Sequence, residues 1–257
     1  MKKLYQDRDW LYKMYWIKKL SIFLIAKEIG VNEKTIGKWL QKLSIPIRPY
    51  TEAIHLARNN HCNLSQEARE WINGELLGDG SLISRSPYSA RVSYSSKYPE
   101  YCQYVLKTLV SFGIEQSGKI TERYHKENDY YSYRYQSRDY VELLSIRNRW
   151  YPEGKKIVPK DIKLTPLTLR QHYIGDGCLI HHRKEKPKER PYIHLCTYGF
   201  LISDVEWLVN ELNKLGFKAT RRNFDNVIRI STFSTQDFLN YIGECPVECY
   251  KYKWNIL

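Results

Sequence analysis

The chain repeats one pattern twice after residue 64, and each copy opens with an apolar segment that ends in Gly-Asp-Gly. The first segment spans residues 71–80 and the second spans residues 169–177. Two strand-like stretches, an amphipathic helix, two further strand-like stretches and a closing helix follow each segment. The order αββαββα, present twice, predicts an α+β fold of two pseudo-symmetric repeats with antiparallel sheets. We place the repeats at residues 65–163 and 164–257.

The two copies can be divided into elements from their periodicity and their turn residues. In the second copy, Ser203 and Glu206 have the spacing of a capping box at a helix start. Each middle helix is expected to end at a glycine, Gly113 or Gly216. The expected strands are 81–85, 91–95, 119–124 and 130–136 in the first copy, and 178–182, 192–197, 218–224 and 227–232 in the second. The expected closing helices are 139–149 and 235–242.

The ends of the two opening helices have the residues expected of a catalytic metal site. Gly74, Gly78 and Gly175 are small enough to let the helices approach closely, which would bring Asp79 and Asp176 together near a pseudo-two-fold axis. A helix C-terminus already carries partial negative charge, so an aspartate there is unfavourable, and two are more so. Divalent cations between the carboxylates would compensate for that charge. A single Gly-Asp-Gly is also an ordinary turn, but two that open matching repeats predict a metal site suited to phosphodiester hydrolysis.

The charge of the chain favours a polyanionic partner. Lys and Arg number 41 against 28 Asp and Glu, which gives a net charge of +13. An anionic membrane surface would also fit this charge, but no apolar run approaches the roughly 18 residues needed to span a bilayer. The start of the chain has no secretory signal, so we expect an intracellular protein, cytoplasmic or organellar and not secreted. The six scattered cysteines suggest neither a disulfide framework nor a zinc site.

Residues 1–50 are predicted to form a separate helical domain. Helices are expected at 9–20, 21–29 and 32–43, with Ala26 at a close helix crossing and Gly30 at the turn. Residues 24–40 resemble the helix-turn-helix of many bacterial regulators and recombinases, in which the second helix reads the major groove. This resemblance nominates four DNA-contacting residues, Asn32, Lys34, Thr35 and Lys38. Residues 51–64 are interpreted as a linker with a short helix at 51–58, since residues 45–49 contain two prolines.

Residues 65–257 resemble the LAGLIDADG endonucleases in their double-motif, single-chain form. The two Gly-Asp-Gly segments carry the resemblance, together with residues 151–162 and 164–169 before the second motif and residues 250–254 at the C-terminus. The resemblance implies a homing-type endonuclease that acts as a monomer on a long, asymmetric site in double-stranded DNA. It also implies Mg²⁺ as the cofactor, with Mn²⁺ able to substitute.

The same resemblance assigns residue roles. Asp79 and Asp176 become the catalytic, metal-binding carboxylates, assisted by the carbonyl groups of Gly78 and Gly175, and Lys156 becomes the basic residue that stabilises the transition state. Family members often have a second lysine near the end of the second copy. Here that region reads Gly-Glu at 243–244, so we expect unequal cleavage of the two strands. Gln171 and His172 stand where small or apolar residues are usual, and His172 is interpreted as a packed side chain.

In this family the strands form a saddle over the major groove, with every second side chain directed to DNA. Tyrosines are interleaved with basic residues here, at positions 88, 94, 124, 131, 133 and 135. The basic candidates for DNA contacts are Arg85, Arg91, Lys97, Lys119, Arg123, Arg134, Arg138, Arg183, Lys184, Lys186, Arg190, Arg221, Arg222 and Arg229.

Two other functions share this fold. The first is a non-catalytic DNA-binding transcription regulator, although a regulator has no need of both aspartates. The second is an intron RNA-splicing maturase, the one reading in which RNA is the partner.

Overall fold

The computed structural model describes residues 3–50, 52–54, 60–181 and 190–256. It divides into two compact units, one containing Met1–Asn60 and the other consisting of His61–Arg85 and Ser89–Leu257. Residues 52–54 are helical, and residues 51 and 55–58 of the short helix expected in the linker lie outside the described residues. In the described part of the chain, no helix combines the length and the apolar character needed to cross a membrane.

The first unit is helical where the sequence predicts helices. Ser21 caps one helix by accepting a hydrogen bond from the Leu24 amide, and Asn32 caps the next by accepting one from the Lys34 amide. Gly30, between these helices, has a φ of +68°, a conformation that favours glycine. The elements are η1 (Leu4–Gln6), α1 (Arg8–Tyr12), a π-helical continuation η2 (Lys13–Ile17), α2 (Ile22–Glu28) and α3 (Glu33–Lys42). Leu11, Ile25, Ile36 and Leu40 form the centre of its core.

The second unit contains two antiparallel four-stranded sheets, as the αββαββα order predicts. The first sheet has the order β1 (Ser81–Ser86), β2 (Ser89–Ser96), β4 (Tyr130–Gln136), β3 (Thr121–His125). The second has the matching order β5 (Gly177–Ile180), β6 (Tyr192–Leu195), β8 (Ile228–Ile230), β7 (Ala219–Arg221). Buried residues pair across the strands, Tyr94 with Tyr135 and Leu195 with Ile228, so one face of each sheet is apolar. The α+β fold class is confirmed.

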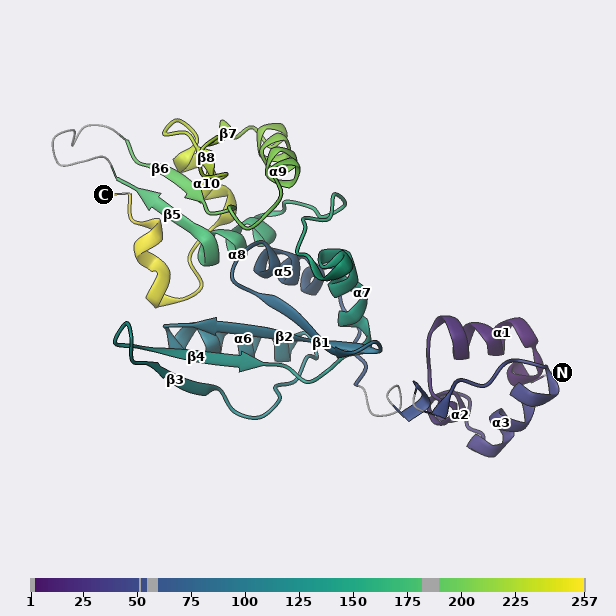
Figure 1. Ribbon diagram of the computed structural model, residues 1–257. Helices are drawn as coiled ribbons and strands as arrows, with labels where there is room; N and C mark the ends of the chain where they lie inside the picture. The colour runs from purple at the N-terminus through teal and green to yellow at the C-terminus, as the bar shows by residue number, and fades with distance from the viewer. Residues whose placement is uncertain (1–2, 51, 55–59, 182–189, 257) are drawn as a thin grey trace. The chain divides into compact units, whose positions relative to one another are not determined.

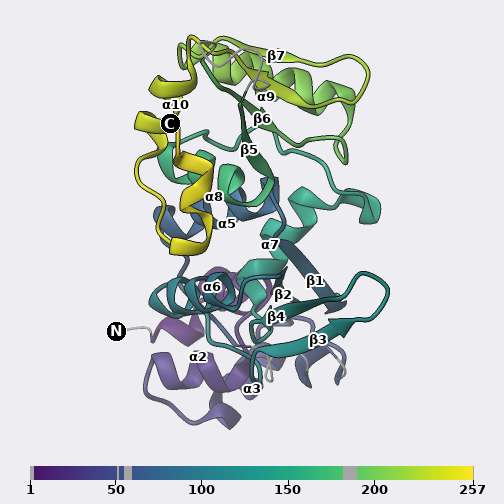
Figure 2. The same ribbon diagram turned by 90° about the vertical axis from the view of Figure 1, so that its left-hand side faces the viewer.

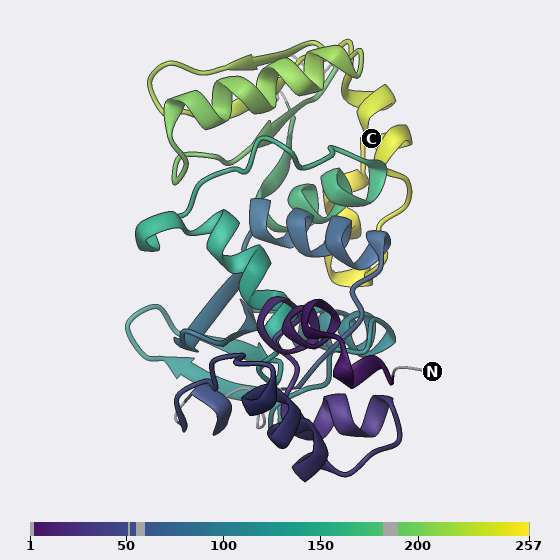
Figure 3. The same ribbon diagram turned by 90° about the vertical axis from the view of Figure 1, so that its right-hand side faces the viewer.

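Two helices, α5 (Gln66–Leu77) and α8 (Pro166–Asp176), lie side by side between the sheets (Figure 1). We call them the motif helices, because each precedes or contains its repeat's Gly-Asp-Gly aspartate. The first sheet is covered by α6 (Pro99–Ser111) and α7 (Val141–Trp150) (Figure 2). The second is covered by α9 (Ile202–Lys214), seen from the opposite side in Figure 3. The remaining elements are η3 (Pro152–Gly154), α10 (Thr235–Ile242) and η4 (Glu248–Trp254).

One core cluster includes side chains from both repeats, among them Trp71, Tyr101, Trp150, Tyr173 and Phe238. The repeats therefore fold against each other, and the motif helices are at the centre of their interface. The expected capping box of α9 is wrong. The helix begins at Ile202 with Leu201 at the N-cap and no side-chain cap, which leaves Ser203 inside the first turn.

Candidate active site

The motif helices approach each other at their glycines. A methyl group at Gly74 would lie 2.5 Å from the Thr168 carbonyl oxygen, and one at Gly175 would lie 3.0 Å from the Asp79 amide nitrogen. These separations are too short for ordinary contacts, so glycine is required for the observed packing. The sequence-based expectation that small residues permit a close approach is confirmed, and the backbones of Gly78, Asp79 and Gly175 meet at one point.

The two predicted metal-binding aspartates lie at this meeting point. Asp79 directly follows the C-cap of α5 and is exposed, whereas Asp176 is the last residue of α8 and is half-buried. Burial, reinforced by the negative charge of Asp79, raises the pKa of the Asp176 carboxyl to about 7. Lys156 and Lys253 oppose this shift. The backbones at the two helix ends meet, and the negative charge of Asp79 acts on the Asp176 carboxyl.

Each repeat supplies one lysine to the site. The Lys156 ammonium donates hydrogen bonds to the carbonyl oxygens of Gly78, at 3.3 Å, and Gly80, at 3.4 Å. The Lys253 ammonium donates to the carbonyl oxygens of Ile174, at 2.5 Å, and Gly175, at 3.1 Å. The pKa of both ammonium groups is lowered, because burial outweighs the opposing effect of the negative charges of Asp79 and Asp176.

The expectation that the second lysine is missing is therefore wrong. Lys253 comes from η4 rather than from residues 243–244, and its side chain is only 7% exposed. Its position was available in the sequence, because Lys156 and Lys253 are separated by 97 residues, the same interval that separates Asp79 from Asp176.

The donor atoms at this point suit a hard divalent cation. Carboxylate and backbone carbonyl oxygens are preferred by Mg²⁺ and Mn²⁺. Within residues 3–50, 52–54, 60–181 and 190–256, no cluster of three or more His, Cys, Asp or Glu side chains could hold a metal alone. A cation held by these oxygen atoms would take its remaining ligands from outside the protein. The Gly78 and Gly175 oxygens already accept from lysines, but each keeps a second lone pair.

Two buried titratable side chains stand one helical turn before the aspartates. Glu75 is 4% exposed and accepts a hydrogen bond of 2.6 Å from the Tyr101 hydroxyl. Burial raises the pKa of Glu75 to about 8. His172, at the matching position of α8, is 1% exposed, and burial lowers its pKa to about 3. His172 is thus a packed, neutral side chain, as expected, whereas the sequence reasoning missed Glu75. An acidic residue within an apolar segment was the available signal.

A groove of about 460 Å³ extends from Asp79 across the open face of the first sheet. Arg134 is exposed on β4 and lies 3.4 Å from the Ser93 hydroxyl, and Arg123 is exposed on β3. Both predicted DNA contacts therefore line the groove next to the aspartate. The other lining residues are mostly small and polar: Ser81, Ile83, Ser93, Tyr94, Ser95, Thr121, His125, Tyr130 and Ser132.

The open face of the second sheet has a different character. The Arg222 guanidinium lies 3.1 Å from the nearer His194 ring nitrogen, 4.3 Å from the Phe224 ring centroid and 3.2 Å from the Asp225 carboxylate. Arg229 is exposed and stacks on Tyr192, with its guanidinium carbon 4.1 Å from the ring centroid. Both predicted arginines are on this face, and each of them contacts an aromatic ring there.

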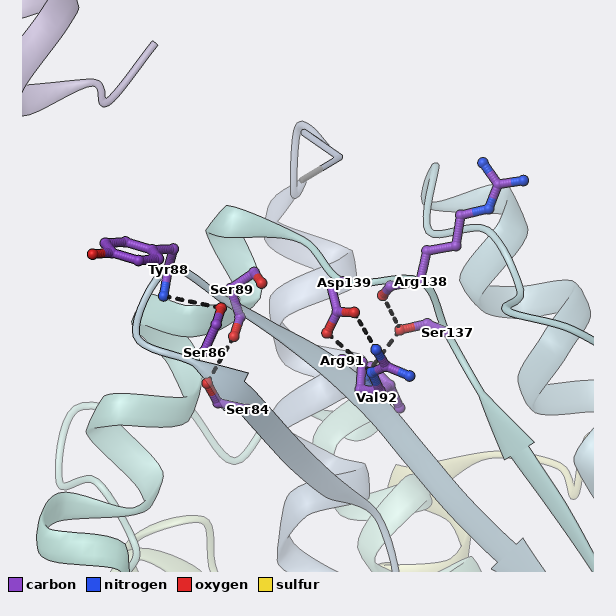
Figure 4. Close-up of polar contacts among 9 residues, drawn as sticks. All are labelled: Ser84, Ser86, Tyr88, Ser89, Arg91, Val92, Ser137, Arg138 and Asp139. Carbon is purple, nitrogen blue, oxygen red and sulfur yellow. Dashed lines mark hydrogen bonds and ion pairs between the residues drawn. The ribbon is translucent and has the colours of Figure 1, made fainter. Parts of the chain in front are cut away.

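Two predicted DNA contacts are engaged within the protein instead. Arg91 forms a bidentate ion pair with Asp139, which attaches β2 to the segment that leads into α7 (Figure 4). Arg221 pairs with Glu206 of α9 at 3.5 Å, because its strand partner Ile228 is buried on the helix-facing side. Tyr94 and Tyr135, also proposed for the binding surface, are buried in the core. We therefore remove these four residues from the DNA-binding set.

The remaining candidates are at the surface or outside the described residues. Six of them are exposed: Arg85, Lys97, Lys119, Arg190, Lys34 and Lys38. Arg138 pairs with Glu115, Asn32 caps α3, and Thr35 is half-buried. Arg183, Lys184 and Lys186 lie outside the described residues.

Comparisons with known proteins agree with this geometry. Residues 69–238 match the model of the LAGLIDADG DNA endonuclease family. An uncharacterized protein of Methanocaldococcus jannaschii is 26% identical over 208 residues, which cover 80% of this chain and 77% of that protein. The solved structure of the homing endonuclease I-WcaI bound to its DNA recognition sequence is similar with a TM-score of 0.66 and 19% identity, covering 83% of this chain and 97% of that chain. The structural likeness supports the fold.

Proposed function

Because this chain belongs to the LAGLIDADG DNA endonuclease family, we propose that it is a homing-type endonuclease that cuts both strands of DNA at a specific site with Mg²⁺. The observation that carries the proposal is the meeting of Asp79 and Asp176 at the ends of the motif helices. Holding two carboxylates together costs folding free energy, and a bound cation offsets that cost. A protein that only bound DNA would gain nothing from this arrangement.

The side chains around this point have separate roles in the proposed reaction. Asp79 and Asp176 would hold Mg²⁺, or Mn²⁺ in its place, with help from the Gly78 and Gly175 carbonyl groups. The bound cation would activate a water molecule and stabilise charge on the phosphate oxygens. Lys156 and Lys253, fixed by helix-end carbonyls, add positive charge on each side of the scissile phosphates.

The sheets supply the binding surface. Arg123 and Arg134 would contact DNA in one half of the target, and Arg222 and Arg229 in the other. Because the two open faces carry different side chains, the two halves of the target should differ in sequence. Both repeats are in one chain, so a monomer suffices for a double-strand break.

The first unit would bind DNA beside the cleavage site as a helix-turn-helix domain. Lys34 and Lys38 are exposed and four residues apart on α3, which places them on the same helix face. A tethered second binding unit raises the effective concentration of the nuclease at its site.

Selection from a randomised DNA library tests this function. The full chain is incubated with the library and Mg²⁺, the cleaved ends are captured and sequenced, and parallel reactions contain EDTA or Ca²⁺. We expect one long, asymmetric sequence that is cut only with Mg²⁺ or Mn²⁺. If Mg²⁺ yields no cleaved ends while the protein retains one specific sequence from the Ca²⁺ reaction, the chain is a DNA-binding regulator instead. Displacement of that DNA by an RNA competitor would indicate a splicing factor.

A further inference from the structure

Gln171 is a buried polar residue that the metal site does not use. It lies on α8, is 1% exposed and faces the other motif helix at Gly74. A methyl group at Gly74 would be only 2.7 Å from the Gln171 Cβ atom. The missing side chain of Gly74 therefore makes room for Gln171 to pass from the second repeat into the first.

The Gln171 amide ends between two tyrosines of α6, a helix of the first repeat. Its Nε2 donates to the Tyr104 hydroxyl at 3.2 Å, and its Oε1 lies 3.4 Å from the Tyr101 hydroxyl. The Tyr101 hydroxyl also donates to Glu75 of α5 at 2.6 Å. Gln171 thus connects α8 with α6, and through Tyr101 with α5; Tyr101 and Glu75 are buried, and Tyr104 is half-buried.

This connection exists on one side of the pseudo-two-fold axis only. The residue equivalent to Gln171 in α5 is Gly74, since each lies five residues before its aspartate, and glycine has no side chain to return the contact. At the position equivalent to Glu75, neither ring nitrogen of His172 has a hydrogen-bond partner in the described part of the chain. Thr165, the N-cap of α8, and Thr168 also bond to Glu70 of α5, but they lie at the helix end far from the aspartates. Gln171 therefore makes the polar contact between the repeats that is nearer to Asp176, and α5 returns no equivalent of it.

We propose that Gln171 is a positioning residue, which fixes the axial position of α8 against α5 and α6 and thereby sets the separation of Asp176 from Asp79. The hydrogen bond from Gln171 Nε2 to the Tyr104 hydroxyl is directional, so it favours one axial position of α8. It lies five residues before Asp176, nearer to the site than the bonds of Thr165 and Thr168 to Glu70. Because Asp176 ends the same helix, any shift of Gln171 moves the carboxylate with it. This inference rests on the proposed nuclease function for its kinetic readout, but not for its metal-binding readout.

The main test replaces Gln171 by leucine, which is similar in size but lacks both hydrogen-bonding groups. Tyr104→Phe, which removes a single hydroxyl, is the second variant if Gln171→Leu folds poorly. Gln236→Leu is the control, because Gln236 is exposed on α10 and bonds to nearby Asn240, far along the chain from the motif helices. Mn²⁺ binding to each full-length protein is followed by electron paramagnetic resonance, and kcat and KM are measured on the selected target.

We expect Gln171→Leu to lower kcat by about 10-fold or more, since a misplacement near 1 Å can cost on the order of 100-fold. Mn²⁺ binding should weaken several-fold, KM for DNA should stay within about 2-fold, and Gln236→Leu should match the wild type. A Gln171→Leu protein with a lower melting temperature but wild-type kcat and Mn²⁺ affinity would overturn the proposal. If the wild type binds Mn²⁺ but cuts no DNA, the nuclease function fails while the Mn²⁺ comparison still decides the role of Gln171. A wild type that binds no Mn²⁺, either alone or with the selected target DNA, would overturn both.

Discussion

Lys156 and Lys253 have the same relation to the two motif helices. Lys156 follows Gly78 by 78 residues and donates to its carbonyl oxygen, and Lys253 follows Gly175 by 78 residues and does the same. The positive charge at each helix end offsets both the helix dipole and the adjacent aspartate. The pseudo-symmetry of the chain thus extends from its helices and sheets to the charged groups of its site.

Replacement of either lysine should therefore impair one strand cleavage more than the other. We expect Lys156→Met and Lys253→Met each to slow cleavage on the order of 100-fold, as removal of one transition-state donor commonly does. Nicked plasmid should accumulate in both cases, with opposite strands cut. Strand-specific labelling of the target measures this. Lys251→Met is the control, because Lys251 is exposed and pairs with Glu248. If Lys253→Met cuts both strands at the wild-type rate, Lys253 has no part in the reaction.

The close helix approach predicts a large effect of one methyl group. Gly74→Ala would place its Cβ atom 2.5 Å from the Thr168 carbonyl oxygen, so the motif helices must separate. We expect a loss of roughly 1–3 kcal/mol in the free energy of unfolding, measured with urea. At Gly199 an added Cβ atom would meet nothing within 4 Å beyond its chain neighbours, so Gly199→Ala should change the free energy of unfolding by less than about 0.5 kcal/mol. Equal stabilities for the two variants would contradict the observed packing.

Burial of His172 predicts acid sensitivity. Its pKa is lowered to about 3 in the folded chain, whereas an unfolded chain binds a proton near pH 6.5. The unfolded state therefore binds more protons as the pH falls below 6.5, and stability declines until the pH reaches the folded pKa. Between pH 7 and pH 5, protonation of His172 in the unfolded chain should lower the free energy of unfolding by about 2 kcal/mol. Urea unfolding of His172→Leu should show a shallower decline; identical pH slopes would show that the imidazole is not buried.

The open and helix-facing sides of the sheets predict different effects for similar arginines. If Arg134 contacts a base, Arg134→Ala should weaken DNA binding by about 1–3 kcal/mol. If Arg134 contacts a phosphate instead, the slope of log affinity against log salt concentration should fall by about 1. Arg221→Ala should leave both unchanged, since its guanidinium pairs with Glu206 on the other side of the sheet. Fluorescence anisotropy on the selected target at several salt concentrations distinguishes these cases. A greater loss for Arg221→Ala would reverse our assignment of the two faces.

The features that the sequence predicted are those that depend on local pattern. The two Gly-Asp-Gly segments and the strand pairs are encoded by nearby residues and are present in the structure, whereas the predicted cap at the start of α9 is not. Neighbouring side chains in a strand point to opposite faces of the sheet, so Arg221 and Arg222 cannot both face DNA. Only the pairing of Arg221 with buried Ile228 shows which of them faces the helices.

The missed features depend on contacts between distant segments. Lys253 lies in the short 3-10 helix η4, and its partners are 78 to 80 residues away. The 97-residue repeat interval gives its position, but only the fold shows that its side chain reaches the end of α8. The bonds of Gln171 to Tyr101 and Tyr104 join residues 70 and 67 positions apart, and those of Arg91 to Asp139 span 48 positions. Such pairings follow from how the helices and sheets pack, which a single sequence does not specify.

The central claim is that Asp79 and Asp176 together hold the cation that drives cleavage. Asp79→Asn preserves the size of the side chain and removes its charge, so the most direct measurement is its cleavage of the selected target in Mg²⁺ beside its DNA affinity in Ca²⁺. We predict DNA binding close to that of the wild type and no detectable double-strand cleavage. Cleavage by Asp79→Asn at the wild-type rate would contradict the account.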